Sequence, residues 1–202
     1  MIGEEKSLAS LAALSPKKQL AFALLVLERM LPSLAAFSKD TGLDASCYAQ
    51  AEDAAWAALQ SGTFDQALNQ ACIKTAPDTE DFSHKLASYA LNAALALSDI
   101  AEFMLDGSAR HIAHVSTLAR DSVYLYISSL EQSVESSPEE ESRVMGHQLL
   151  QREQRQQEED IRFLSGLPDR FDQDAIPTLR VRASAQAPLL PFALNGDDQG
   201  LR

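Results

Sequence analysis

Two histidines stand close together in a segment with the periodicity of a helix. His111 and His114 are three residues apart, so they share a helix face, and Asp106 stands just upstream. Two imidazoles and a carboxylate are ligands that suit zinc or iron. A di-iron bundle, however, takes Glu-x-x-His motifs from two helices, and the sequence has none. We therefore expect surface or capping histidines and neither metal nor cofactor, with His111 and His114 as weak metal candidates.

A line of polar residues interrupts the most apolar segment of the chain. Asn92, Asp99 and Asp106 recur every seven residues, which places them along one side of a helix, and Glu102 stands beside them. Such a line is either exposed to solvent or hydrogen-bonded in the interior. If Asp99 is buried, it needs a cationic partner. Arg29 is a candidate because it too interrupts an apolar run.

These five residues permit two interpretations. The first is a ligand cleft beside the helix, in which buried carboxylates would have shifted pKa values. The second is a solvent-exposed edge without a binding role, which is favoured because charged residues are seldom buried. The chain contains no dinucleotide-binding, phosphate-binding, nucleophile-elbow or zinc-protease motif that would name a reaction.

The chain has two cysteines, Cys47 and Cys72. Both stand in alanine-rich helical patterns without a flanking metal-binding or catalytic motif. This context favours two small buried thiols, because free cysteine is commonly buried. A disulfide or a catalytic thiol stays open as the alternative.

The distribution of proline, glycine and apolar residues predicts helices almost throughout. Ser15 and Pro16 form a cap and first-turn pair, since proline's missing N–H costs nothing there. Pro32 is predicted to interrupt the following helix and to open a short one that ends near Gly42. Residues 84–106 are apolar around most of a helix girth, which is typical of the middle of a bundle. We predict an all-α, single-domain helical bundle with a long apolar central helix.

Residues 151–160 contain no apolar side chain. If a helix continues through them, the inward positions are Leu150, Gln154, Gln157, Ile161 and Leu164. One interpretation, which is favoured, is a solvated helix that flanks the body of the protein. The other is a polar seam between subunits, in which glutamines hydrogen-bond across the interface and set its register. In that case Leu150, Gln154, Gln157 and Ile161 are interface residues of a homodimer.

The last part of the chain departs from the helical pattern. Residues 178–184, which follow Pro177, alternate in the manner of a strand and predict at most a marginal one. Two prolines and a GDDQG run over 183–202 predict a poorly ordered tail. We therefore divide the chain into a helical domain over 1–167 and a divergent C-terminal segment over 168–202.

Two blocks of sequence carry a family resemblance. The first is the run Glu28, Arg29, Met30, Leu31, Pro32, followed by Phe37, Thr41, Gly42, Tyr48 and Trp56. The second is YALNAALALSDIAEFMLDG at 89–107. Over about residues 11–167 the chain resembles the YjaG-like bacterial proteins, a family catalogued as domain of unknown function 416. The resemblance implies an all-helical, cytoplasmic, bacterial domain and supplies no catalytic residues.

Composition limits the class of partner. The chain has 202 residues, of which 46% are hydrophobic and 23% charged, as suits one folded domain with a core. Seventeen Lys and Arg against 29 Asp and Glu give this acidic protein a formal charge of −12. Because that average field repels polyanions, we expect no nucleic-acid binding.

The N-terminal segment predicts neither a signal peptide nor a membrane span. Its apolar stretch over 20–27 is followed by Glu28 and Arg29, where a signal peptide would have a small-residue cleavage site. The stretch is also much shorter than the roughly 20 apolar residues that a span requires. We therefore expect a cytoplasmic protein without a membrane segment.

The lack of a catalytic constellation favours a non-enzymatic protein-interaction domain. Its expected partner is itself, as a homodimer, or another protein. The alternative is a small-molecule-binding protein or an enzyme that uses a polar cleft beside the central helix. The sequence identifies no substrate for that alternative.

Overall fold

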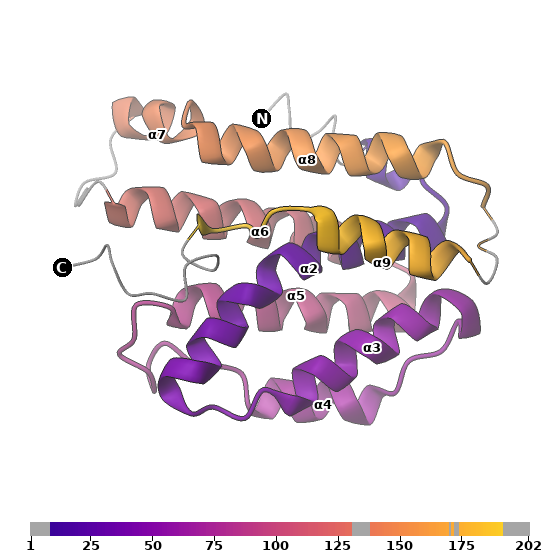
Figure 1. Cartoon of the computed structure of the whole chain (residues 1–202), viewed down its shortest axis with the longest axis horizontal. Helices are drawn as coiled ribbons and strands as arrows, with labels where there is room; N and C mark the ends of the chain where they lie inside the picture. Colours follow the sequence, from indigo (N-terminus) through magenta and orange to yellow (C-terminus); the bar gives the residue numbers. More distant parts are fainter. Residues whose placement is uncertain (1–8, 131–137, 170, 172–173, 192–202) are drawn as a thin grey trace.

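The computed structural model describes residues 9–130, 138–169, 171 and 174–191 (Figure 1). A short helical turn over residues 9–12 precedes eight longer helices within these ranges. They are α2 (Pro16–Thr41), α3 (Ser46–Ser61), α4 (Gln66–Lys74), α5 (Ala87–Asp106), α6 (Ala109–Leu130), α7 (Pro138–Met145), α8 (Gln148–Ser165) and α9 (Ala175–Ala185). No strand occurs among the described residues, so the predicted all-α fold is confirmed.

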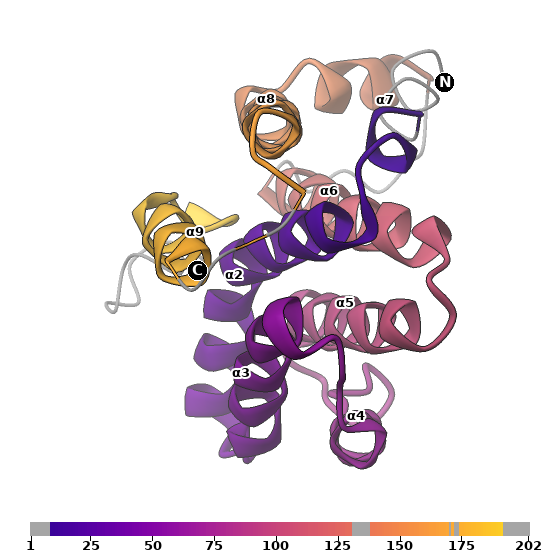
Figure 2. The same ribbon diagram turned by 90° about the vertical axis from the view of Figure 1, so that its right-hand side faces the viewer.

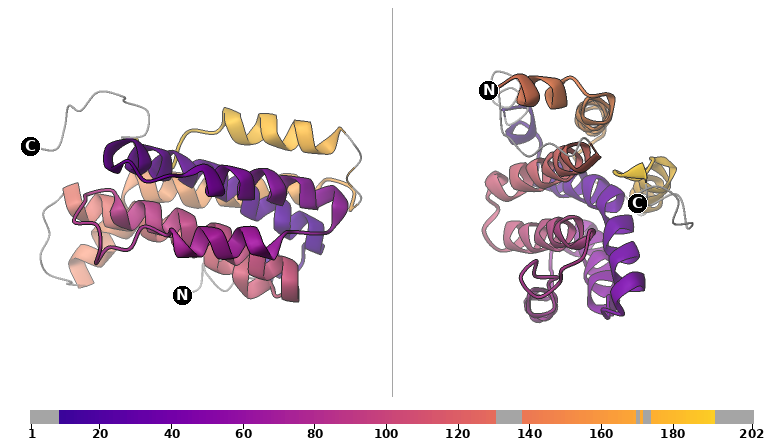
Figure 3. Two further views of the ribbon diagram at one scale, coloured as in Figure 1. Left: turned by 90° about the horizontal axis from the view of Figure 1, so that it is seen from below. Right: turned by 90° about the vertical axis from the view of Figure 1, so that its left-hand side faces the viewer.

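α2 runs through the middle of the bundle and contacts α3, α5, α6, α8 and α9. Figure 2 shows α8 above α2 and α6, α9 beside α2, α5 below, and α4 at the lower edge. The right-hand view of Figure 3, from the opposite end of the molecule, shows the same order from α7 and α8 down to α4. Because α2 is surrounded, consecutive apolar side chains on all its faces are buried, including Phe22, Leu24, Leu25 and Leu27 at 0% exposure.

α5 is the apolar helix that the sequence predicts over 84–106. It ends at Gly107, whose φ of 69° is the left-handed conformation that favours glycine after a helix. The helix contacts α2, α3, α4 and α6. One line of its surface stays uncovered, with Leu95 39% and Leu105 60% exposed. α5 is therefore a core helix with one solvent-facing line.

The predicted interruption at Pro32 is wrong. α2 continues through Pro32 and ends at Thr41, before Gly42. Proline removes one backbone hydrogen bond from the helix. Ser33, Leu34 and Phe37 beyond it are nevertheless buried, and their packing maintains the helical conformation.

Among the described helices, α2 is long and apolar enough to span a membrane by length and composition. The apolar stretch over 20–27 that the sequence predicts underestimates the length of the apolar helix, because buried apolar residues continue to Phe37. In the bundle, 72% of its apolar window is buried. The core helix of a soluble protein produces the same pattern, so this match is weak evidence for a membrane span.

The C-terminal segment is helical where the sequence predicts a marginal strand. Residues 178–184 lie in α9, so the strand is wrong. Residues 183–191, where the predicted tail begins, pack against the body of the protein, and Leu189 and Leu190 are buried. The backbone N–H of Leu189 donates to the carbonyl of Arg29 at 2.8 Å. The rest of the predicted tail, 192–202, lies outside the described residues.

Candidate functional site

Arg29 is a charged residue that α2 carries into the interior, with only 3% of its surface exposed. Its guanidinium forms a two-pronged pair with Glu153 of α8, Nε to Oε2 at 3.1 Å and Nη2 to Oε1 at 2.8 Å. Its Nη1 donates to Oδ2 of Asp160, also on α8, at 2.9 Å. The predicted pairing of Arg29 with Asp99 is therefore wrong. Its carboxylate partners come from the segment that contains no apolar residue.

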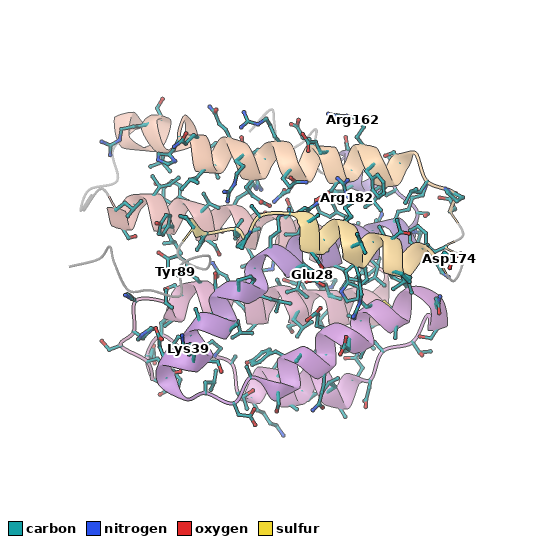
Figure 4. All side chains as sticks on the ribbon, viewed as in Figure 1. Glu28, Lys39, Tyr89, Arg162, Asp174 and Arg182 are labelled. Atoms are coloured by element: carbon teal, nitrogen blue, oxygen red, sulfur yellow. The ribbon has the colours of Figure 1, made fainter. Side chains whose placement is uncertain are left out.

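Asp160 joins α8 to α9. Its side chain is fully buried, and its Oδ1 accepts from Nε and Nη2 of Arg182 at 3.1 and 2.8 Å. Gln186 donates its amide to the same oxygen at 2.8 Å and accepts from Arg29 at 2.6 Å. Arg182 projects from α9 on the side where that helix lies next to α8, and its guanidinium stacks 4.3 Å from the ring centre of Phe163 (Figure 4).

Gln157 extends these contacts to α6. Its side-chain amide donates to Oε1 of Glu153 at 2.9 Å and to the backbone carbonyl of Ser116 at 3.2 Å. Its oxygen accepts from the Ser116 hydroxyl at 2.6 Å. Gln157 is thus hydrogen-bonded in the interior of one chain, whereas the sequence favours a solvated helix and offers a seam between subunits as the alternative.

We call this set the ion cluster: Arg29, Glu153, Asp160 and Arg182, with Gln157 and Gln186. Two guanidinium groups and two carboxylates cancel in charge. Burial alone lowers the pKa of Arg29, but the ion pairs with Glu153 and Asp160 outweigh it and raise that pKa above its ordinary value. A buried pair with this many hydrogen bonds is costly to break, since one missing partner leaves an uncompensated charge. The ion cluster therefore holds α2, α8 and α9 together.

The predicted subunit seam is occupied within the chain. Leu150, Gln157 and Ile161 are buried, and α8 contacts α2 and α6. Gln154 is half-buried. The buried side of α8 includes Glu153 and Asp160, so the helix is held by α2 and α9 of the same molecule. Leu150, Gln157 and Ile161 are therefore covered within one chain.

The sequence pattern does not predict Glu153, Asp160 or Arg182 as site residues. The signal for the two acids is their spacing, since positions 150, 153, 157, 160 and 164 also recur at three- and four-residue intervals. Periodicity does not distinguish that stripe from the predicted one through Gln154. Arg182 gives no signal, because its segment is interpreted as a marginal strand.

The predicted polar line of α5 faces α6. Asp99 contacts two imidazoles, Oδ1 lying 3.3 Å from Nδ1 of His111 and Oδ2 2.6 Å from Nδ1 of His114. Asp106 Oδ2 lies 3.2 Å from Nε2 of His111. Further along, Asn92 donates to the Ser122 hydroxyl at 3.0 Å. We call Asp99, Asp106, His111 and His114 the histidine cluster.

The histidine cluster is open to water. The side chain of Asp99 is 15% exposed and that of His114 is 53% exposed. Burial opposes the charging of His111, but the hydrogen bonds and charges of Asp99 and Asp106 together outweigh it and raise its pKa. The pKa of Asp106 is lowered, chiefly by the backbone N–H of Ser108. Glu102 is half-buried on α5. The predicted ligand set thus splits, with Arg29 in the ion cluster and the rest on α5.

The metal candidates His111 and His114 share one carboxylate. Within the described residues, no group of three or more His, Cys, Asp and Glu side chains is arranged to hold a metal ion. Both ring nitrogens of His111 and Nδ1 of His114 instead lie next to the carboxylates of Asp99 and Asp106.

Two further acidic residues that the sequence pattern does not predict as site residues, Glu28 of α2 and Glu52 of α3, lie near Arg180 of α9. The Trp56 indole donates to Oε1 of Glu28 at 2.9 Å (Figure 4 labels Glu28). Burial, followed by the hydrogen bond and charge of Glu28, raises the pKa of Glu52 to about 7. Arg180 of α9 opposes this shift and lies 5.5 Å from the Trp56 ring centre. These groups couple the protonation of Glu52 to the contact with α9.

Comparison with known proteins agrees with this fold. The family model described as "Protein of unknown function (DUF416)" matches residues 6–187, which include α9. A crystal structure of a DUF416 family protein from Shewanella baltica OS155 superimposes with a TM-score of 0.80 and 19% sequence identity, covering 90% of this chain and 96% of that one. No curated protein matches the chain. Since the family model covers most of its length, the chain belongs to the DUF416 family of proteins of unknown function.

Proposed function

We propose that this chain is a non-enzymatic, cytoplasmic protein-interaction domain that forms a homodimer through the uncovered line of α5. That line consists of Leu91, Leu95, Ser98, Glu102 and Leu105, spaced three and four residues apart. The observation that carries the proposal is the exposure of its leucines, 39% for Leu95 and 60% for Leu105, on a helix otherwise in contact with α2, α3, α4 and α6. Leucines aligned on one open helix face are typical of a contact surface.

The order of residues along this line suits an antiparallel pairing with a second copy. With Ser98 at the centre, the small side chain lets two helices approach closely, and Leu91 of one copy comes opposite Leu105 of the other. Such a self-complementary surface is what a two-fold symmetric dimer requires. The formal charge of −12 on each copy opposes association, so apolar burial must drive it. Salt should therefore strengthen the dimer by screening.

The test is the mass of the protein in solution, measured by light scattering over a range of concentrations. We expect the wild type to be a dimer and Leu95→Glu/Leu105→Glu to be a monomer with unchanged helical circular dichroism. Val181→Glu is the matched control, because Val181 is 70% exposed on α9 and should leave the dimer intact. A monomeric wild type, or a double variant that stays dimeric, would refute self-association through α5.

One observation supports a second candidate, a small-molecule-binding protein or an enzyme. Asp99 holds Nδ1 of His114 at 2.6 Å while half of that side chain faces solvent, an arrangement that suits a general base. Thermal-shift measurements with a panel of small metabolites would test it on the wild type and on Asp99→Asn. A compound that stabilises only the wild type supports this candidate, and a panel without any stabilising compound counts against it.

A further inference from the structure

The two cysteines meet at the junction of α3 and α4. Cys47 lies in the first turn of α3 and Cys72 in the last turn of α4. The Cys47 sulfur lies 3.4 Å from Oγ1 of Thr75, and that hydroxyl is 3.2 Å from the Cys72 carbonyl. Thr75 therefore lies next to both cysteines, contacting the side chain of Cys47 and the backbone of Cys72. The sequence favours two small buried thiols and leaves a disulfide open; the structure places both cysteines beside the Thr75 hydroxyl.

The two thiols differ in their access to solvent. Cys47 is half-buried, whereas only 3% of Cys72 is exposed. Burial, followed by the hydrogen bond from Cys47, raises the pKa of Cys72 to about 12. Since the thiolate is the reactive form, an external reagent should meet Cys47 first.

α4 is the helix that can move to let the sulfurs bond. It has nine residues, and its main helix contacts are with α3 and α5. Its Asn69 is buried, with 1% of its surface exposed, and neither polar atom of its side-chain amide has a hydrogen-bond partner among the residues that the structure describes. A buried amide without partners weakens the packing of the element that carries it. Local opening of α4 would therefore expose Cys72 at low cost.

We propose that Cys47 and Cys72 are a redox-active pair that closes into a disulfide by exchange with a low-molecular-weight disulfide. The Cys47 thiolate attacks one sulfur of the reagent, forming a mixed disulfide and releasing one small thiolate. The Cys72 thiolate then attacks the Cys47 sulfur and expels the second small thiolate. The protein loses two electrons and two protons, and the reagent is reduced to two thiols. The resulting disulfide links α3 covalently to α4.

The test uses the full chain with oxidised glutathione, followed by acid quenching and mass spectrometry. We expect a product lighter than the reduced protein by two hydrogen atoms, whose digest contains a cross-linked pair of peptides holding Cys47 and Cys72. A thiol reductant should restore the original mass. The matched variants separate the steps: Cys72→Ser should accumulate a glutathione adduct on Cys47, and Cys47→Ser should react far more slowly.

Two results would overturn the proposal. One is a wild type that accumulates the glutathione adduct on Cys47 without closing, which would mean that Cys72 does not resolve it. The other is a wild type whose thiols both stay free at a glutathione concentration that modifies Cys72→Ser. Neither result depends on the oligomeric state, so this test is independent of the α5 dimer.

Discussion

The ion cluster and the histidine cluster each place one carboxylate between two cationic side chains, but in different surroundings. Asp160 is fully buried between Arg29 and Arg182. Asp99, whose side chain is 15% exposed, lies between His111 and His114 where α5 and α6 pack together. The first cluster joins helices from the two ends of the chain, and the second joins consecutive helices.

The choice of cation matches the surroundings. A guanidinium stays charged at all ordinary pH values and offers several donors in one plane, so it can satisfy buried carboxylates permanently. An imidazole gains and loses its proton near neutral pH, so an exposed pair with Asp99 changes strength with pH. The comparison indicates that the ion pairs between α2, α8 and α9 keep their strength at all ordinary pH values, whereas the contact between α5 and α6 weakens as the histidines lose their protons.

The largest expected effect comes from removing the guanidinium of Arg29, which pairs with both carboxylates of the ion cluster. Arg29→Met leaves Glu153 without its guanidinium and deprives Asp160 of one of its two, in a site without water access. We expect the free energy of unfolding, measured by chemical denaturation, to fall by about 3–5 kcal/mol. Lys39→Met is the control, because Lys39 is exposed on the same helix and should change stability little (Figure 4).

A paired substitution sharpens this result. Arg29→Met/Glu153→Leu removes the charge that Arg29→Met leaves unpaired, while Asp160 keeps Arg182. Part of the lost stability should therefore return. A double variant less stable than Arg29→Met would mean that the carboxylate itself is not the source of the cost.

A smaller effect is expected at the polar edge of the ion cluster. Gln157→Leu leaves the Ser116 hydroxyl without its acceptor and removes one donor from Glu153. Loss of one partner from buried polar groups should lower the free energy of unfolding by about 1–3 kcal/mol. Gln154→Leu on the same helix is the control, with an expected change within about 0.5 kcal/mol. Equal effects at the two positions would contradict the assignment of Gln157 as the buried glutamine.

The smallest effect, and the one that depends on pH, belongs to the histidine cluster. The pKa of His111 is raised by its contacts with Asp99 and Asp106, so the folded state binds the proton more tightly than the unfolded state. This stabilisation is fully present below the unfolded pKa of about 6.5 and is lost as pH rises through the higher folded value.

Asp99→Asn should therefore lower the pKa of His111 in an NMR titration and flatten the dependence of stability on pH above about 6.5. The imidazole of His147, which caps α8, is an internal reference whose titration should not change. An unchanged His111 titration in Asp99→Asn would show that Asp99 does not hold the charged imidazole.

The sequence by itself determined the all-α class and several helix ends, such as those at Pro16, Gly42 and Gly107, because these depend on neighbouring residues. Apolar spacing at three and four residues, the proline in the first turn of α2 and the glycine after Asp106 act within one or two turns. The tertiary structure decided which charged groups meet. Arg29 and Asp160 are 131 residues apart, and α9, which supplies Arg182, becomes recognisable only when it lies on α2 and α8. A local pattern cannot assign such partners, because ion pairing in the interior depends on which helices pack together and which of their faces exclude water.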